Sequence, residues 1–276
     1  YADAFAHHWR SIRRWDRRNT GGFSSNEQAT GNPYAPTPIE TCCTIAWMAL
    51  SVDMLRLTGD ALVADELELA TCNACAGAQH PSGRWWTYNT PMNGLREASA
   101  HAIVFQARPG TPELNCCSVN GPRGYAMLAD WALMKTSDGL VLNYYGPGQW
   151  LARLDHRTRV RIRSETEYPL TGQVRLTLHP DRQTNFTLRL RIPGWTPKAR
   201  VRLNGIEVEG ARPGHYLPLN RPWHDGDTLE LDFALELKAV PGDRETRGQV
   251  CFYRGPLLLA YDQRYNPFDD PNLPLT

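Results

Sequence analysis

The spacing of apolar residues changes once along this chain, near residue 138, and this change limits the folds open to it. Between Glu40 and Leu57 apolar residues recur at three- and four-residue intervals, the period of an amphipathic helix. After Gly139 apolar and polar residues alternate, which is the period of a half-buried strand. The sequence therefore predicts a multidomain α plus β protein, helical over residues 1–137 and β-rich over residues 138–276.

Local signals predict where the first helices begin and end. The helix that starts near Glu40 is expected to stop at Thr58-Gly59, because glycine adopts the left-handed conformation that ends many helices. Asp60 is a favourable N-cap for the next helix, which we expect to end near Gly77.

A third helix is expected to begin near Pro122, because proline is tolerated in a first helical turn. Its apolar positions continue through Leu128, Trp131 and Met134 towards Gly139. Residues 83–88 are expected to form a short strand between the helices.

The second half contains repeated short segments that alternate apolar and polar residues. Asn204-Gly205 separates two of them and is a strong signal for a tight β-hairpin. Strands at this spacing predict an antiparallel β-sandwich. The alternating segments cover residues 160–163, 174–178, 188–192, 201–203 and 229–233.

Charge and composition exclude some classes of function. The chain has 30 Lys and Arg against 29 Asp and Glu, so it has no overall charge that would attract nucleic acid or an anionic membrane. No apolar stretch is long enough to span a bilayer. The chain starts at Tyr1, without an initiator Met and inside an expected helix, so we expect further helices upstream. Its 7 cysteines suit free thiols or metal ligation better than a disulfide framework, which favours a reducing, cytoplasmic compartment without determining it.

Two cysteine doublets suggest a metal site. They are Cys42-Cys43, with Glu40 two positions upstream, and Cys116-Cys117. Adjacent cysteines do not readily bond to each other, because a disulfide needs converging Cβ vectors. Three thiolates and a carboxylate would complete a tetrahedral Zn²⁺ site. The alternative is that these are small buried side chains, since free cysteine is often buried.

Other candidate residues have ordinary explanations as well. Cys72 and Cys75 form a CxxC motif, but it lies in an alanine-rich helical segment without the βαβ pattern of redox proteins, so core packing is favoured. Cys251 alternates like a sandwich core residue. Glu27 follows a polar, glycine-rich loop and is either a second reactive carboxylate or a solvated side chain.

The motifs resemble those of the zinc-thiolate β-L-arabinofuranosidases, glycoside hydrolase family 127 and its relative 146. The resemblance starts from Glu40-x-Cys42, Cys116-Cys117-x-x-Asn120 and Thr20-Gly21-Gly22 ahead of Glu27. It continues through Ile192-Pro193-Gly194-Trp195, Leu203-Asn204-Gly205, Trp223-His224-Asp225-Gly226-Asp227 and Tyr253-Arg254-Gly255-Pro256-Leu257.

The resemblance implies the C-terminal part of an (α/α)6 barrel followed by the β-sandwich. It also implies that Glu40, Cys42, Cys116 and Cys117 bind Zn²⁺, that Cys116 is the nucleophile and that Glu27 is the general acid/base. The implied activity is retaining exo-hydrolysis that releases L-arabinofuranose, or a similar furanose, from β-linked oligosaccharides or plant-derived glycans.

Two other functions stay open from the sequence. One is a non-catalytic, zinc-stapled carbohydrate-binding or structural module, a truncated hydrolase. The other is a redox protein that uses Cys72 and Cys75. The oligomeric state is also open, a homodimer included.

Overall fold

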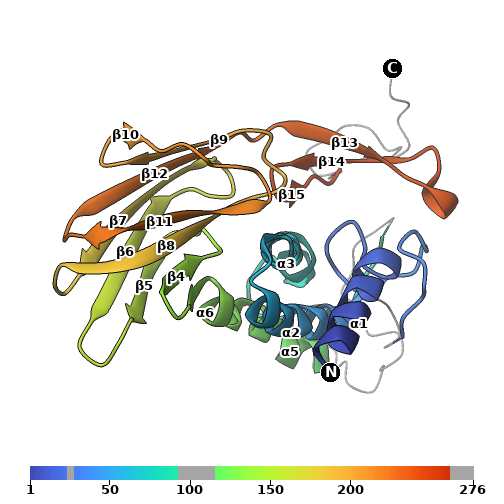
Figure 1. The fold of residues 1–276 in the computed structure, drawn as a ribbon. Coiled ribbons are helices and arrows are strands. Elements are labelled where there is room, and N and C mark those ends of the chain that lie inside the picture. Colours follow the sequence, from blue (N-terminus) through green and yellow to red (C-terminus); the bar gives the residue numbers. More distant parts are fainter. Residues whose placement is uncertain (24–27, 93–115, 262–276) are drawn as a thin grey trace.

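The protein is represented by a computed structural model, which describes residues 1–23, 28–92 and 116–261 (Figure 1). Its helices are α1 (Ala2–Trp15), α2 (Thr41–Thr58), α3 (Ala61–Leu69), the π-helix η1 (Ala70–Cys75), α4 (Ala76–Ala78), α5 (Cys116–Ala126), α6 (Leu128–Trp131) and the 3₁₀-helix η3 (Arg244–Thr246). Its strands are β1 (Ile39–Glu40), β2 (Asn89–Thr90), β3 (Leu133–Lys135), β4 (Gly139–Leu142), β5 (Gly148–Arg153), β6 (Arg159–Thr166), β7 (Gln173–Pro180), β8 (Thr184–Ile192), β9 (Ala199–Leu203), β10 (Ile206–Glu207), β11 (His215–Trp223), β12 (Asp227–Phe233), β13 (Leu237–Pro241), β14 (Val250–Arg254) and β15 (Leu257–Leu258).

The C-terminal end of α2 and the N-terminal start of α3 confirm the predicted signals. Gly59 ends α2 in the left-handed conformation, and its amide donates to the Leu55 carbonyl over 2.8 Å. The Asp60 carboxylate then accepts the amide hydrogen of Leu62 at the start of α3. None of the described helices is long and apolar enough to cross a membrane.

Three local predictions were wrong, each because packing between distant segments outweighed a local signal. Helix α5 begins at Cys116, so Pro122 lies in its interior and not in its first turn. The helix predicted to continue past Met134 has already ended, because β3 pairs with β4 at the edge of a sheet. Residues 83–88 form no strand; Trp86 makes an isolated bridge to Gln79, and the strand β2 follows it.

The helices surround α2, which is buried along most of its length. The rings of Trp9 on α1 and Trp47 on α2 stack with centroids 5.3 Å apart. The Trp9 indole nitrogen also donates to the Ser51 hydroxyl over 2.9 Å, so this buried polar group is satisfied. These contacts hold α1 against α2, as Figure 1 shows.

Two sheets make up most of the second half. One has six strands in the order β10-β9-β12-β7-β6-β5, and the other has four in the order β11-β8-β4-β3. All pairs are antiparallel except β4 with β8, which run parallel. The predicted hairpin joins β9 to β10, with Asn204 and Gly205 at φ 50° and 82°. Strand β3 lies before residue 138, where the sequence predicts the boundary between the helical and the β-rich domain. The position of this boundary stays a prediction.

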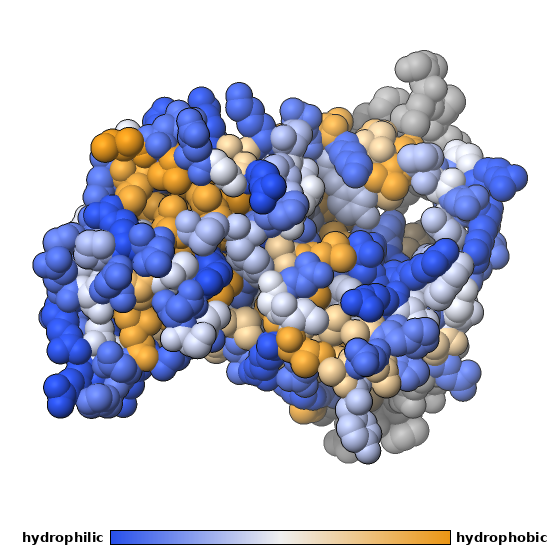
Figure 2. All heavy atoms as spheres, viewed as in Figure 1, coloured by the Kyte–Doolittle hydropathy of each residue, from blue (hydrophilic) through white to orange (hydrophobic). Residues whose placement is uncertain are grey.

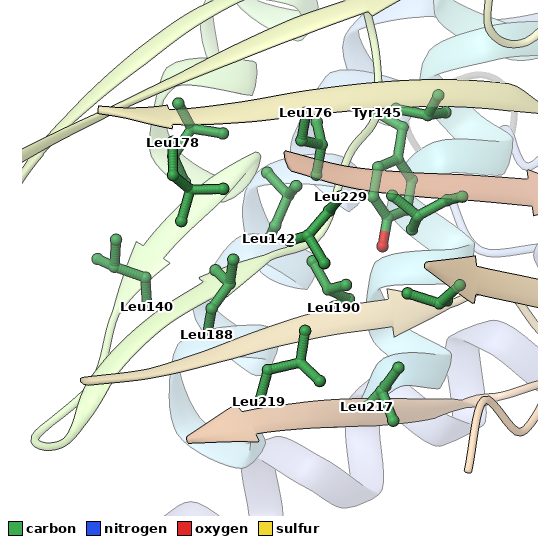
Figure 3. Close-up of a cluster of buried hydrophobic side chains, with 14 of the residues drawn as sticks. Leu140, Leu142, Tyr145, Leu176, Leu178, Leu188, Leu190, Leu217, Leu219 and Leu229 are labelled. Atoms are coloured by element: carbon green, nitrogen blue, oxygen red, sulfur yellow. The ribbon is translucent and has the colours of Figure 1, made fainter. Parts of the chain in front are cut away.

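The two sheets enclose one apolar core, because every second residue of their strands points inward. Leu176 and Leu178 of the six-stranded sheet face Leu188 and Leu190 of the four-stranded sheet in Figure 3, and all four are fully buried. Figure 2 shows the hydrophobic side chains between the sheets and hydrophilic ones around them.

A buried ionic network joins the helices to the four-stranded sheet. The Arg191 guanidinium of β8 is wholly buried and pairs with Asp65 and Glu68 of α3, at 2.6 Å for Glu68. The indole nitrogen of Trp195 donates to the second Glu68 oxygen over 2.9 Å. A buried ion pair adds little net stability, but removing one partner is costly because the other charge is left unpaired. The network therefore fixes how α3 sits on the sheet.

Candidate functional site

Glu40 and Cys42 lie where strand β1 passes into helix α2. Glu40 pairs with Asn89 of β2 and is the N-cap residue of α2. The Thr41 amide donates to the Tyr88 carbonyl over 3.0 Å, and its hydroxyl donates to the Thr87 carbonyl over 2.7 Å. This short strand pair, which the sequence analysis missed, fixes the first turn of α2.

Cys116 and Cys117 are the first two residues of α5, which packs closely on its neighbours. A Cβ atom at Gly121 would lie 2.3 Å from the Trp86 ring, and one at Gly124 would lie 2.4 Å from the Cys75 sulfur. The Ser118 hydroxyl adds a 3.0 Å hydrogen bond to the Trp86 carbonyl. The missing side chains at both glycines therefore let α5 approach Trp86 and Cys75 of η1.

This packing brings three thiols together. The sulfur atoms of Cys42, Cys116 and Cys117 all lie within 4.8 Å of one another. The Cys117 thiol donates to the Cys42 sulfur over 3.2 Å. Cys117 is wholly buried, Cys42 is half-buried and Cys116 is exposed. Both predicted cysteine doublets thus contribute to one cluster, although 75 positions separate Cys42 from Cys117.

The three thiols differ in acidity. The hydrogen bond from Cys117, opposed by burial and helped by the Asn120 amide at 3.3 Å, lowers the pKa of Cys42 to about 6. Burial raises the pKa of Cys116. The same hydrogen bond to Cys42 raises the pKa of Cys117, since its proton is held in that bond. The cluster is therefore arranged to hold negative charge on Cys42 first.

Glu40 stands next to this cluster. Its side chain is wholly buried. The negative charge of Glu40 partly opposes the hydrogen bonds that lower the pKa of Cys42, and it adds to the burial that raises the pKa of Cys116. Among the described residues, the potential ligand atoms that all lie within 4.8 Å of one another are the three cysteine sulfurs, and this group does not include a Glu40 oxygen. Three soft thiolates and one carboxylate are a donor set that suits Zn²⁺.

Asn120 belongs to the sequence motif Cys116-Cys117-x-x-Asn120, which assigned it no role, and the structure makes it a functional candidate. One turn of α5 beyond Cys117, its amide nitrogen donates to Cys42, and its amide oxygen accepts from Arg123 over 2.7 Å. Arg123 thus orients the amide so that its donor side faces the sulfur.

The other predicted residues lie elsewhere. Glu27 is outside the described residues. The carbonyl of Thr20, in the glycine-rich loop ahead of it, accepts from the Ala74 amide of η1 over 3.2 Å. Burial raises the pKa of both Cys72 and Cys75, in the case of Cys75 to about 12. Cys75 belongs to the helical core, as predicted.

Two family models match this chain. The GH127 catalytic domain of beta-L-arabinofuranosidases matches residues 1–130, and the GH127 middle domain matches residues 139–235. The chain belongs to this family. The catalytic-domain match contains all three clustered thiols and Glu40.

Individual relatives agree with this family. A non-reducing end beta-L-arabinofuranosidase of Bifidobacterium longum is 27% identical over 247 residues, which cover 83% of this chain and 36% of that protein. A solved glycoside hydrolase superposes with a TM-score of 0.75 at 26% identity, covering 91% of this chain and 46% of its own. A GH127 beta-L-arabinofuranosidase from Geobacillus stearothermophilus T6 superposes with a TM-score of 0.73 at 28% identity. The match covers 91% of this chain and 41% of the Geobacillus chain. The chain described here spans less than half of the length of each of these relatives.

Proposed function

We propose that this GH127 chain carries the nucleophile and metal ligands of a retaining exo-glycoside hydrolase that releases L-arabinofuranose from β-linked glycans. The observation that carries the proposal is the cluster of Cys42, Cys116 and Cys117 in a chain of this family. The Bifidobacterium relative is a non-reducing end beta-L-arabinofuranosidase, which supports this substrate class.

The proposed metal ligands are Glu40, Cys42, Cys116 and Cys117. Their donor chemistry fits Zn²⁺, and the negative charges they would hold need a cation for compensation. When bound, zinc would keep the thiols ionised at neutral pH and moderate their nucleophilicity.

Exposure supports different roles for the three thiols. Cys117 is wholly buried and cannot reach a sugar, whereas Cys42 accepts hydrogen bonds from Cys117 and Asn120 that stabilise it as a ligand. Cys116 is the exposed thiol of the cluster. We therefore assign Cys116 as the nucleophile.

The proposed reaction has two displacement steps. The Cys116 sulfur attacks the anomeric carbon while the bond to the leaving oxygen breaks and Glu27 gives its proton to that oxygen. Glu27 then takes a proton from a water molecule, whose oxygen attacks the anomeric carbon as the carbon–sulfur bond breaks. Two inversions at one carbon give retention.

We further propose that the described helices belong to an (α/α)6 barrel. Helices α2 and α5 would then be neighbours in the barrel wall, with the thiol cluster at their N-terminal ends. Support comes from the GH127 catalytic-domain match over residues 1–130 and from the packing of α2 between its helical neighbours. The cluster would face the sugar-binding end.

Covalent trapping tests the proposal directly. The protein is treated with an arabinofuranose-configured epoxide, and peptide mass spectrometry locates the label, which we expect on Cys116. Proton NMR of the turnover product should show retained configuration, and metal analysis should show one zinc per chain. Labelling of another residue, or inversion, contradicts the mechanism.

A non-catalytic, zinc-stapled module is the second candidate. The thiol cluster joins α2 to α5, so a metal there would stabilise the helices even without turnover. Stoichiometric zinc with sugar binding, but neither labelling nor turnover, would favour this function.

A further inference from the structure

The outer face of the six-stranded sheet contains two regions that differ in charge. Along its strands, buried residues that face the core alternate with exposed residues that face outward. The helices attach to the other sheet through Arg191, so this face lies on the opposite side of the sandwich from them. Figure 1 shows the turn between β5 and β6 at the end of the sandwich remote from the helices.

On strands β7, β12 and β9 the outward-facing arginines lie beside acids. The Arg175 guanidinium is 2.6 Å from the Glu230 carboxylate, and the Arg200 guanidinium is 2.8 Å from the Asp232 carboxylate. A hollow of about 330 Å³ over this region has as many acids as arginines in its wall. Its charged residues are Glu165, Arg175, Arg200, Arg202, Glu230 and Asp232. This part of the face is therefore locally neutral.

The hairpin of β5 and β6 carries an excess of positive charge. Residues 148–166 contain five arginines against one aspartate and one glutamate, a surplus of three positive charges, whereas the whole chain has a net charge of +1. Arg159 and Arg161 alternate with buried residues of β6, so both side chains face outward. Arg153 of β5 is exposed and lies directly opposite Arg159, so it shares that face. Arg153, Arg159 and Arg161 are called the arginine ladder below.

The arginine ladder has no acid to balance its charge. Within the part of the chain that the structure describes, none of its three guanidinium groups forms an ion pair. Asp181 contacts Arg159 through the backbone, where its amide donates to the Arg159 carbonyl over 3.0 Å. Like charges directly opposite each other, such as Arg153 and Arg159, destabilise an antiparallel strand pair. An anionic ligand bound here would remove this repulsion.

Other acids around the ladder bind other groups. The next outward-facing residue of β6, Arg163, pairs with Glu165 over 2.9 Å. On the neighbouring strand β7, the His179 ring nitrogen Nδ1 lies 2.7 Å from a carboxylate oxygen of Asp225. These contacts leave the ladder as the uncompensated part of the sheet face.

Side chains hold the turn between β5 and β6 in one conformation. The Asp155 carboxylate accepts the amide hydrogen of Arg157 over 2.6 Å and the hydroxyl hydrogen of Thr158 over 3.1 Å. The Arg182 guanidinium donates to the same hydroxyl over 2.6 Å. The backbone that carries the ladder is thus ordered before any ligand binds, which lowers the entropic cost of binding.

The ladder suits a polymer with carboxylate groups. A guanidinium group is planar and can donate two parallel hydrogen bonds to one carboxylate. Residues two positions apart on a strand are about 6.5 Å apart, so several ladder arginines can meet successive groups of one chain. Leu151, opposite Arg161 and 69% exposed, adds apolar surface for C–H groups. Uronic acid residues of a polysaccharide provide both carboxylates and C–H groups.

We propose that the arginine ladder, Arg153, Arg159 and Arg161, binds the carboxylates of an acidic polysaccharide that contains uronic acid residues. The site lies on the sheet that faces away from the helices and their thiol cluster, so it anchors the protein to a polymer and takes no part in bond cleavage. The choice of a glycan as the ligand rests on the proposed function, whereas the anion-binding surface itself does not.

Calorimetric titration with polygalacturonate tests the ligand chemistry. The control polymer is the fully methyl-esterified form, which has the same backbone without its negative charge. The wild-type protein should bind the free acid at least about tenfold more tightly than the ester, because hydrogen bonds to ionised acceptors are stronger. Equal affinity for both polymers, or no binding of the free acid, overturns the proposal.

The double variant Arg153→Gln, Arg161→Gln tests the position of the site. Its Kd for polygalacturonate should rise at least about tenfold, because two charge-assisted contacts are lost. The matched control is Arg175→Gln, Arg200→Gln, which removes the same charge from ion-paired arginines of the same face. In about 0.15 M salt, where screening limits distant charges, the Kd of the control should rise less than about threefold. Equal losses would reduce the effect to net charge, and an unchanged ladder variant would remove the site.

Two further measurements separate this proposal from its alternatives. Single-stranded DNA at the same concentration of negative charge should bind more weakly than polygalacturonate, and tighter binding of DNA would replace the glycan by nucleic acid. The kcat/KM of the ladder variant for a neutral aryl β-L-arabinofuranoside should stay within about twofold of wild type, and a larger loss would contradict a site outside the catalytic centre. A wild-type protein without any turnover would reject the proposed function, and the titrations would still decide the ladder.

Discussion

Two groups of cysteines in this GH127 chain lie in different surroundings, and one thiol of the first group, Cys42, differs in acidity from both thiols of the second. Cys42, Cys116 and Cys117 meet at the N-terminal ends of α2 and α5, whereas Cys72 and Cys75 lie in the π-helix between them in sequence. Hydrogen bonding lowers the pKa of Cys42 to about 6, while burial raises the pKa of Cys75 to about 12.

The difference comes from the neighbours and not from the residue type. Cys42 receives hydrogen bonds from a thiol and an amide, which favour the thiolate. Cys75 has its sulfur 3.8 Å from the Gly121 carbonyl, an acceptor that favours the protonated thiol. A CxxC motif thus has little meaning until its surroundings are known.

The largest expected effect separates the two groups by activity. Cys116→Ser should lower kcat for an aryl β-L-arabinofuranoside by about 10³-fold or more, because the serine hydroxyl is a poor nucleophile at neutral pH. The kcat of Cys75→Ala should stay within about twofold of the wild-type value when both proteins are compared at equal folded fraction, because Cys75 contributes only to core packing. Similar losses of kcat in Cys116→Ser and Cys75→Ala would contradict the distinction between a catalytic and a packing cysteine.

Alkylation of the metal-free protein compares the thiols directly. A lowered pKa means that Cys42 is ionised at neutral pH, so its reaction with iodoacetamide should rise with pH to a plateau above about pH 7. Cys75, with its raised pKa, should react at least about 10²-fold more slowly at pH 7. Peptide mass spectrometry measures both rates. We expect added zinc to protect Cys42 from alkylation. Labelling of Cys75 faster than Cys42 in the metal-free protein would contradict the difference in pKa.

Gly124→Ala tests whether Cys75 is a packing residue. The new methyl group would meet the Cys75 sulfur at 2.4 Å, so the free energy of unfolding should fall by about 1–3 kcal/mol in urea titrations. The loss should shrink in a Cys75→Ala background. Gly77→Ala is the matched control, because no atom lies within 4 Å of its added Cβ. Alanine favours a helix more than glycine does, so an equal loss at Gly77 would mean that the loss at Gly124 does not come from contact with Cys75.

The smallest expected effect concerns the Asn120 hydrogen bond. Asn120→Ala should raise the alkylation midpoint of Cys42 by about one pH unit, because a hydrogen bond to a charged group contributes about 1.5 kcal/mol. Arg123→Ala should raise it less, since Arg123 only orients the amide. A midpoint unchanged in Asn120→Ala would leave Cys117 as the main donor that lowers the pKa of Cys42.

Much of the fold could be predicted because its signals are local. The alternating segments became strands β6, β7, β8, β9 and β12, and Asn204-Gly205 became the hairpin turn. The start of α5 could not be predicted, because Pro122 is a local signal that close packing at Gly121 and Gly124 outweighed. Met134 likewise joined a strand because β4 lay beside it.

The sequence by itself determined the helical and β-rich halves, the turn at Asn204-Gly205 and the residue types for a thiolate site. Each of these depends on neighbours within a few positions, whose period or side chain sets the local conformation. Only the tertiary structure decided that Cys42 meets Cys116 and Cys117 while Cys75 enters the core. Burial and hydrogen bonding between distant segments set the pKa of a thiol, and no local pattern contains them.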